Sequence, residues 1–146
     1  MKSIREADVK GKKVLVRADL DVPLERKADG GKRYAVNDDF RLQKCLPTLK
    51  YLLENNAQVI LCGHLDRPGG KAVRDLRMSP VVKKLEELLG VAIMYDPAAG
   101  ETPEVRSARL GEALRRSTAE TSGVKEAAGP IWLLENLRFD SREEKN

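Results

Sequence analysis

Four short runs of apolar residues, rich in Val, Ile and Leu, alternate along the chain with longer segments of mixed polarity. A continuous apolar run of four or five residues, bounded by charged or turn residues, predicts a β-strand that is buried on both faces. Strands of this kind belong to parallel sheets, whose faces are covered by helices. The predicted strands are Val14–Ala18, Val59–Cys62, Val91–Tyr95 and Ile131–Leu134.

Apolar residues at helical spacing fill the first two intervals between these strands. A helix is expected from Asp38-Asp39 onward, with a kink or a late start at Pro47, because proline lacks the backbone N–H. The second helix has clearer boundaries, since Ser79 fits the N-cap, Pro80 the first turn and Gly90 the stop. The residues predicted to face the core are Leu42, Leu46, Leu49 and Leu53 in the first helix, and Val82, Leu85 and Leu89 in the second.

A third helix is predicted from Thr102-Pro103 to about Arg116, followed by a loop with the sequence STAETSG. Glu25–Asn37, between the first strand and the first helix, is predicted to be a long flexible loop. The alternation of strands and helices predicts an α/β domain, a three-layer αβα Rossmann-like parallel sheet.

Composition limits the classes of function. A chain of 146 residues with interspersed charges, 34% of the total, is expected to form one folded domain. The net charge of +4 suits an anionic ligand, but the basic helix, zinc-ligand spacing and aromatic motifs of nucleic-acid-binding proteins are missing from the sequence. Cys45 and Cys62 lie apart in apolar segments, which favours reduced core thiols and a reducing, cytoplasmic location. No apolar run reaches the length of a signal peptide or a membrane span.

Ligands of open parallel sheets bind outside the carboxyl ends of the strands, so the residues after each strand are candidates for a site. The first helix returns antiparallel to the strands, which brings its N-terminal turn to the same edge. Arginine's planar fork suits carboxylate and phosphate, so several arginines at one edge predict a site for a small, multiply charged anion. The candidates are Asp19 and Asp21, His64 and Arg67, Glu135, Asn136 and Arg138, and Arg41 of the first helix.

Each of these side chains also has a purely structural interpretation. Arg41 could be a solvated charge, and His64, the single histidine, could satisfy a turn. Arg67 could pair with Asp66 alone. The two aspartates after the first strand could organise the turn before Pro23. Arg138 could likewise form a salt bridge with Glu135 or Glu143.

Two alternatives of other classes remain open at this stage. The sequence D-L-D-V after an apolar strand resembles the first motif of haloacid dehalogenase-like phosphatases, with Asp19 as nucleophile and Asp21 as acid/base. The next strand end, C-G-H-L-D-R-P, lacks the Ser or Thr that such enzymes use there. The second alternative is a non-catalytic domain that senses a phosphorylated metabolite. Neither a G-x-x-x-x-G-K-[ST] nor a G-x-G-x-x-G nucleotide motif occurs in the chain.

Five segments in order closely resemble phosphoglycerate kinases: V-L-V-R-A-D-L-D-V-P-L, N-D-D-F-R-L, L-P-T-L-K-Y-L-L-E, V-I-L-C-G-H-L-D-R-P and L-L-E-N-L-R-F. The resemblance covers almost the whole chain and points to the N-terminal domain of a two-domain kinase, the domain that binds 3-phosphoglycerate. It implies the reversible phosphoryl transfer between ATP and 3-phosphoglycerate that gives 1,3-bisphosphoglycerate and ADP, a step of glycolysis.

The resemblance also implies roles for single residues. Arg41 would be the catalytic arginine, and Asp19 would hydrogen-bond the hydroxyl region of the substrate. His64, Arg67 and Arg138 would bind the 3-phosphate. The implied substrate-binding set is Asp19, Leu20, Asp21, Arg41, His64, Leu65, Asp66, Arg67 and Arg138. The implied cofactor is Mg-ATP or Mg-ADP, bound by the family's second domain, with no cofactor or metal site in this chain and a monomer as the expected state.

The chain departs from the family pattern in three places. The family usually has Asn at Asp21 and Gly at Asp66, so both positions add negative charge beside an anion site and should weaken binding unless each carboxylate is paired or turned outward. Arg106–Gly129 is longer and more irregular than expected, and we assign it no role. Residues 1–146 are therefore expected to be a truncated substrate domain, without the nucleotide-binding domain and inactive as a kinase alone.

Overall fold

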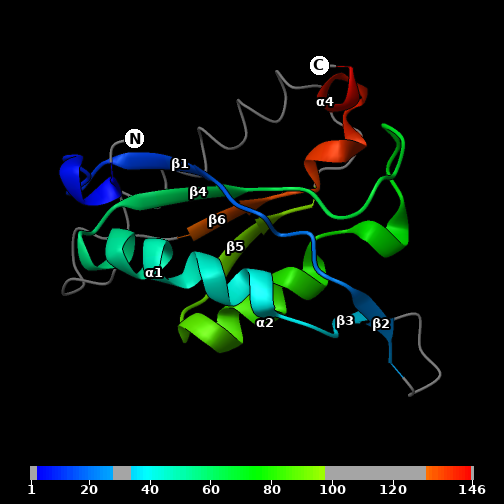
Figure 1. Ribbon diagram of the computed structural model, residues 1–146, viewed down its shortest axis with the longest axis horizontal. Coiled ribbons are helices and arrows are strands. Elements are labelled where there is room, and N and C mark those ends of the chain that lie inside the picture. The colour runs from blue at the N-terminus through cyan, green and yellow to red at the C-terminus, as the bar shows by residue number, and fades with distance from the viewer. Residues whose placement is uncertain (1–2, 28–33, 98–130, 146) are drawn as a thin grey trace.

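The computed structural model describes residues 3–27, 34–97 and 131–145. Its centre is a parallel four-stranded sheet in the order β1-β4-β6-β5 (Figure 1). The strands are β1 (Lys13–Arg17), β4 (Gln58–Cys62), β6 (Ile131–Leu134) and β5 (Ile93–Asp96). All four predicted strands are present, with ends shifted by at most two residues, and the predicted α/β class with a parallel sheet is confirmed.

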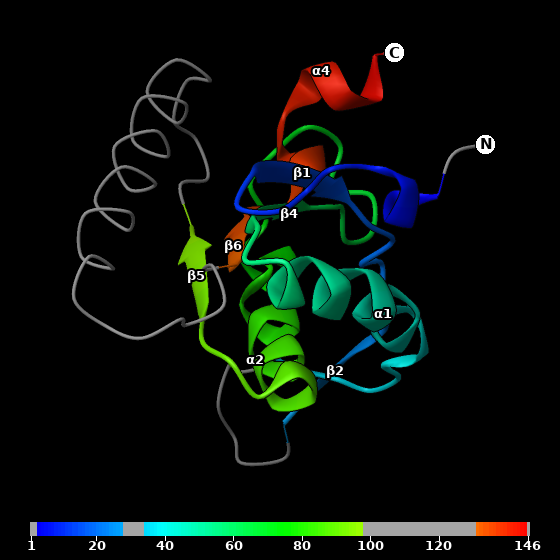
Figure 2. The ribbon, with the colours of Figure 1, turned by 90° about the vertical axis from the view of Figure 1, so that its left-hand side faces the viewer.

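Helices α1 (Phe40–Glu54) and α2 (Ser79–Leu89) lie together on one side of the sheet (Figure 2). Side chains of alternating strand residues point toward them and form the core with the inner faces of both helices. The opposite face of the sheet carries a row of apolar side chains at paired positions. The row runs through Leu15, Ile60, Trp132 and Met94.

Helix α1 starts at Phe40 and continues through Pro47, so the late start proposed for it is wrong. Its predicted inner face is correct at Leu42, Leu49 and Leu53, which are buried. Leu52, not predicted, is buried as well and widens the apolar stripe. This stripe holds the helix on the sheet although proline removes one of its hydrogen bonds.

Helix α2 follows the sequence prediction closely. Ser79 is its first helical residue and Met78 takes the N-cap position, so the N-cap prediction for Ser79 is off by one residue. Gly90 ends the helix in the left-handed conformation, with φ +70°, where a glycine has no steric cost.

The prediction of a flexible loop over Glu25–Asn37 is wrong at both ends of that range. Strands β2 (Leu24–Arg26) and β3 (Tyr34–Val36) pair antiparallel as a small second sheet beside α2. Residues 28–33 between them are outside the described part of the chain. Each strand has only three residues, too few for an alternating pattern to be visible in the sequence.

Four short helical turns complete the described structure: Ile4–Glu6, Arg74–Leu76, Leu137–Phe139 and α4 (Ser141–Glu144). The helix predicted at 102–116, with the loop after it, falls outside the described residues. Among the helices that are described, none has the length and apolarity needed to cross a membrane.

Candidate functional site

The carboxyl ends of β1, β4 and β6 meet at one edge of the sheet, which we call the rim (Figure 1). Gly63, the residue after β4, permits the close approach of the segments after β1 and β4. A Cβ atom there would lie 2.7 Å from the Ala18 carbonyl oxygen and 2.8 Å from Leu20 Cγ. Residue 63 must therefore be glycine for the first two rim segments to pack as they do.

Arg41 reaches the rim from the first turn of α1. Asp38 Oδ1 accepts the Phe40 N–H at 2.8 Å in an Asx turn that leads into this first turn. Arg41 Nη1 then lies 3.0 and 2.9 Å from the two carboxylate oxygens of Asp19. The side chains of Arg41 and Asp19 are 49% and 59% exposed, so this pair adds little stability. The pair places the Arg41 guanidinium beside Asp19 at the rim.

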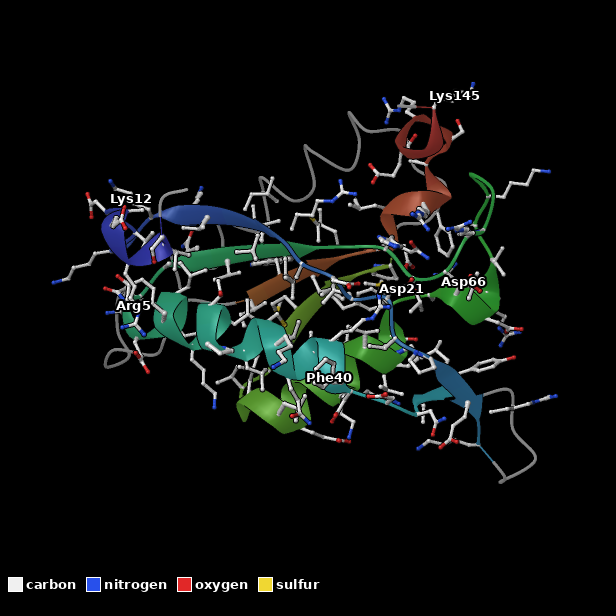
Figure 3. All side chains as sticks on the ribbon, in the orientation of Figure 1. Arg5, Lys12, Asp21, Phe40, Asp66 and Lys145 are labelled. Carbon is white, nitrogen blue, oxygen red and sulfur yellow. The ribbon has the colours of Figure 1, made fainter. Side chains whose placement is uncertain are left out.

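Asp21 connects several rim side chains. Its Oδ1 accepts the Asp66 N–H at 2.8 Å, while its Oδ2 lies 3.7 Å from His64 Nε2 and 4.0 Å from Arg41 Nη1. Figure 3 shows Asp21 and Asp66 on neighbouring segments of the rim. The carboxylate of Asp21 therefore has a backbone donor as well as nearby cationic or polar groups.

Asp66 adopts a left-handed backbone conformation, with φ +54°. Aspartate tolerates this region better than most residues, but glycine is favoured there. The Asp66 carbonyl accepts a hydrogen bond from Arg138 Nη1 at 2.9 Å, which draws Arg138 to the β4 segment. Arg138 does not form the salt bridge with Glu135 or Glu143 that the sequence allowed. Instead, Glu135 lies beside Arg77, and Glu143 pairs with Arg17.

The remaining sequence candidates differ in their surroundings. Arg67 is exposed and has no hydrogen bond or ion pair within the described part of the chain. Leu20 and Leu65 are buried in the core, 0% and 1% exposed. Both backbone groups of Leu65 bond to Asn136, at 3.2 Å from the N–H and 2.7 Å to the carbonyl. Their roles as substrate contacts remain predictions.

Sequence reasoning placed Glu135 and Asn136 on the rim but gave them no function. In the structure they are the buried polar side chains of the described residues, 1% and 0% exposed. Glu135 Oε2 accepts a hydrogen bond from the Tyr95 hydroxyl at 2.8 Å. Burial, and next this hydrogen bond, raise the pKa of Tyr95 well above its ordinary value. The sequence signal is a polar dipeptide directly after a buried strand.

A second, mainly cationic cavity of about 230 Å³ lies at the N-terminal end of α2, and it shares Tyr34 and Asp75 with a cavity at the rim that Asp21 and Asp66 line. Its cations are Arg74, Arg77 and Lys83, and Tyr34 of the hairpin also lines it. A hydrogen bond to Asp75 raises the pKa of the Tyr34 hydroxyl. The cavity is a second place where an anion could bind, so it is an alternative to the rim as the anion site.

The fold and rim together define an α/β domain that gathers arginines and a histidine at the carboxyl edge of a parallel sheet. A model of one protein family, phosphoglycerate kinase, matches residues 4–146. The chain belongs to the phosphoglycerate kinase family. This result overturns the haloacid dehalogenase-like phosphatase alternative.

Curated relatives agree with the family model. The phosphoglycerate kinase of Microcystis aeruginosa is 40% identical over 144 residues, which are 99% of this chain and 31% of that protein. The chloroplastic phosphoglycerate kinase of Volvox carteri is 42% identical over 142 residues, which are 97% of this chain and 26% of that protein. The chain thus spans about a third or less of the length of these relatives.

Solved structures show the same fold. The crystal structure of phosphoglycerate kinase from Pyrococcus horikoshii superposes with a TM-score of 0.67 at 27% identity, covering 100% of this chain and 30% of that one. Phosphoglycerate kinase from Coxiella burnetii gives a TM-score of 0.61 at 27% identity, covering 94% of this chain and 28% of that one.

Proposed function

We propose that this chain is the part of a phosphoglycerate kinase that binds 3-phosphoglycerate, the acceptor in reversible phosphoryl transfer from ATP. One observation carries the proposal: cationic and polar side chains from three separate segments converge around Asp21 and Asp66. Arg41 and His64 face Asp21, at 4.0 and 3.7 Å, and Arg138 bonds to the Asp66 carbonyl at 2.9 Å. A phosphate ester that also carries a carboxylate offers the anionic oxygens that arginine side chains bind.

Arg41 is the residue we assign to the reacting group. Its Nη1 bonds to Asp19, which leaves the Nη2 and Nε donors to face a ligand. Phosphoryl transfer depends on alignment and charge stabilisation, and an arginine at the transferring group is worth roughly 10³–10⁵ in rate in other enzymes. The acceptor carboxylate is already ionised, so the reaction needs no general base from this chain.

His64, Arg67 and Arg138 are assigned to the 3-phosphate, and Asp19 to the hydroxyl region of the acid. Binding energy from the phosphate, which does not react, would hold the carboxylate in place beside Arg41. Leu20, Leu65 and the Asp66 backbone would then shape the site without charged contacts.

Mg-ATP supplies the phosphoryl group in this proposal, and we derive no step through it. Within the described ranges, no group of three or more His, Cys, Asp or Glu side chains could hold a metal ion. We assign the nucleotide to the larger part of the relatives' length that the chain does not span, and expect the 146 residues alone to bind substrate without transferring phosphoryl. The free thiols of Cys45 and Cys62 support a cytoplasmic location, and we expect a monomer.

Calorimetric titration with 3-phosphoglycerate tests the proposal. The chain should bind saturably, and Arg138→Ala and Arg67→Ala should each weaken binding at least tenfold. Lys50→Ala removes one positive charge from the exposed surface of α1 and should change affinity less than twofold. Equal loss in all three variants would indicate a response to net charge rather than a site at the rim. Binding that survives both arginine substitutions would favour the non-catalytic module, with its site elsewhere.

A further inference from the structure

The buried dipeptide Glu135-Asn136 directly follows β6, in the same rim segment as Arg138, and bonds to the β4 segment that carries His64 and Arg67. Buried polar side chains persist in a core when their hydrogen-bonding groups are satisfied. The side chains of this dipeptide bond to the β4 segment, to the start of α2 and to β5. These partners are 40 to 71 residues away in the sequence. Its side chains therefore hold together segments that are not consecutive in the chain.

Asn136 uses all the hydrogen-bonding capacity of its amide group. Its Oδ1 accepts from the N–H groups of Leu65 and Arg138, at 3.2 and 3.1 Å. Its Nδ2 donates to the carbonyls of Leu65 and Leu76, at 2.7 and 3.0 Å. A primary amide offers two donors and two acceptor sites, and the only other side chain with these groups, that of Gln, carries them on a stem one methylene longer.

Two further bonds join the same segments. The Leu137 N–H donates to the Gly63 carbonyl at 3.1 Å, and Arg138 Nη1 donates to the Asp66 carbonyl at 2.9 Å. His64 lies between the first two bonded positions of the β4 segment, Gly63 and Leu65. Its backbone is therefore fixed on both sides relative to the segment that carries Arg138.

Glu135 holds the other end of the loop that follows β4. Its Oε1 accepts from the N–H groups of Met78 and Asn136, at 3.0 and 2.9 Å. Tyr95 and Arg77 face its Oε2, at 2.8 and 3.6 Å. The loop between β4 and α2 is thus attached near its start by Asn136 and near its end by both residues.

We propose that Asn136 is a positioning residue of the anion site, oriented by Glu135: it fixes His64 and Arg138 in one geometry before the ligand arrives. The inference rests on the proposed function for the identity of the ligand, 3-phosphoglycerate. Ligand sites lose affinity when their groups move by fractions of an ångström, so a residue that touches no ligand can control binding through this geometry.

The test substitutes Asn136→Ala, which removes all four hydrogen bonds without changing charge. We expect 3-phosphoglycerate to bind more than tenfold more weakly, measured by calorimetry under conditions where the variant is fully folded. Leu49→Ala is the matched control, because it removes core volume from α1, where Leu49 is 0% exposed, and leaves the rim untouched. It should lower stability and change affinity less than twofold. Unchanged affinity in folded Asn136→Ala would overturn the proposal.

Glu135→Gln separates hydrogen bonding from charge. The amide oxygen can still accept the N–H groups of Met78 and Asn136, so affinity should stay within threefold of the original chain. A loss as large as that of Asn136→Ala would contradict the proposal, because the negative charge and not the orientation of Asn136 would then govern the site.

Amide hydrogen exchange on the unmodified chain gives a readout that needs neither a variant nor a ligand. The N–H groups of Leu65 and Arg138 both donate to Asn136 Oδ1, so both should be protected from exchange relative to exposed loop amides. Exchange of both amides at the rate of an exposed loop amide would overturn the positioning role. If both amides are protected but 3-phosphoglycerate does not bind, the proposed function fails and the positioning of the rim by Asn136 stands.

Discussion

The backbone N–H of Asp66 donates a hydrogen bond to Asp21 Oδ1 at 2.8 Å, across the gap between the ends of β1 and β4. Asp21 and Asp66, the two single residues at which the resemblance predicts a departure from the family pattern, are therefore in direct contact. This donor and the Arg41 guanidinium at 4.0 Å lie beside the Asp21 carboxylate, and His64 Nε2 lies 3.7 Å from it. Asp66 contributes its backbone, and its side chain is exposed.

Asp21→Asn should strengthen the binding of 3-phosphoglycerate. The amide oxygen can keep the bond from the Asp66 N–H, while the negative charge 3.7 Å from His64 and 4.0 Å from Arg41 is removed. For partly exposed groups the change in binding free energy is about 1 kcal/mol, or roughly fivefold in affinity. Calorimetry of both proteins at one ionic strength measures it, and weaker binding in the variant would contradict the account of this carboxylate.

Asp66→Gly should raise the free energy of unfolding by about 0.5–1 kcal/mol, because φ +54° is strained for a residue with a Cβ atom. Asn56→Gly is the matched control, since Asn56 has the same φ and lies away from the rim. Urea unfolding should show similar gains for both, and titration should show a change in affinity for Asp66→Gly alone. Destabilisation by Asp66→Gly would mean that the aspartate side chain holds the loop.

Gly63→Ala should destabilise the chain by about 2–3 kcal/mol, since the added methyl group would overlap the Ala18 carbonyl and Leu20, and backbone cannot move away cheaply. Gly69→Ala provides the comparison: its Cβ would meet no atom within 4 Å, although φ is +70°. Its cost should stay near 1 kcal/mol. Thermal or urea unfolding of the pair distinguishes crowding from backbone strain, and equal losses would argue against the crowding.

Cys45 should react slowly with alkylating reagents in the folded chain. Burial raises its pKa to about 11 and also raises the pKa of Cys62, so at neutral pH both thiols remain protonated and lack the reactive thiolate. The reaction of Cys45 should accelerate as pH rises toward 11. Because the pKa of Cys45 is higher in the folded chain than in the unfolded chain, its contribution to the free energy of unfolding is fully present at a pH below its ordinary pKa. This contribution is lost as the pH rises through the raised pKa of about 11. Mass spectrometry of labelling against pH tests this; fast labelling of folded protein at pH 7 would contradict it.

The sequence was informative where residues act through local patterns. The four strands, the inner face of α1 and the Gly90 stop all depend on apolar spacing or on a single backbone conformation. The convergence of Arg41, His64 and Arg138 on one edge followed from parallel topology, because the ends of parallel strands meet. None of these predictions required knowing the distance between two atoms.

Contacts between residues far apart in the sequence leave no local pattern, and the sequence did not predict them. The β2–β3 hairpin has strands of three residues, and its pairing is decided by packing beside α2. The role of Asn136 depends on partners 60 and 71 residues away. A buried amide and a solvated one look the same in sequence, so the bonds that assemble the rim emerged only from the folded chain.

The most direct test of the rim as the substrate site is the response of backbone amides in an ¹⁵N-labelled chain to 3-phosphoglycerate, followed by NMR. The account predicts the largest saturable shifts at Arg41 and within residues 19–21, 64–67 and 136–138, with small shifts elsewhere. Shifts centred on Tyr34, Arg77 and Lys83, around the second cationic cavity, or none at millimolar ligand, would contradict it.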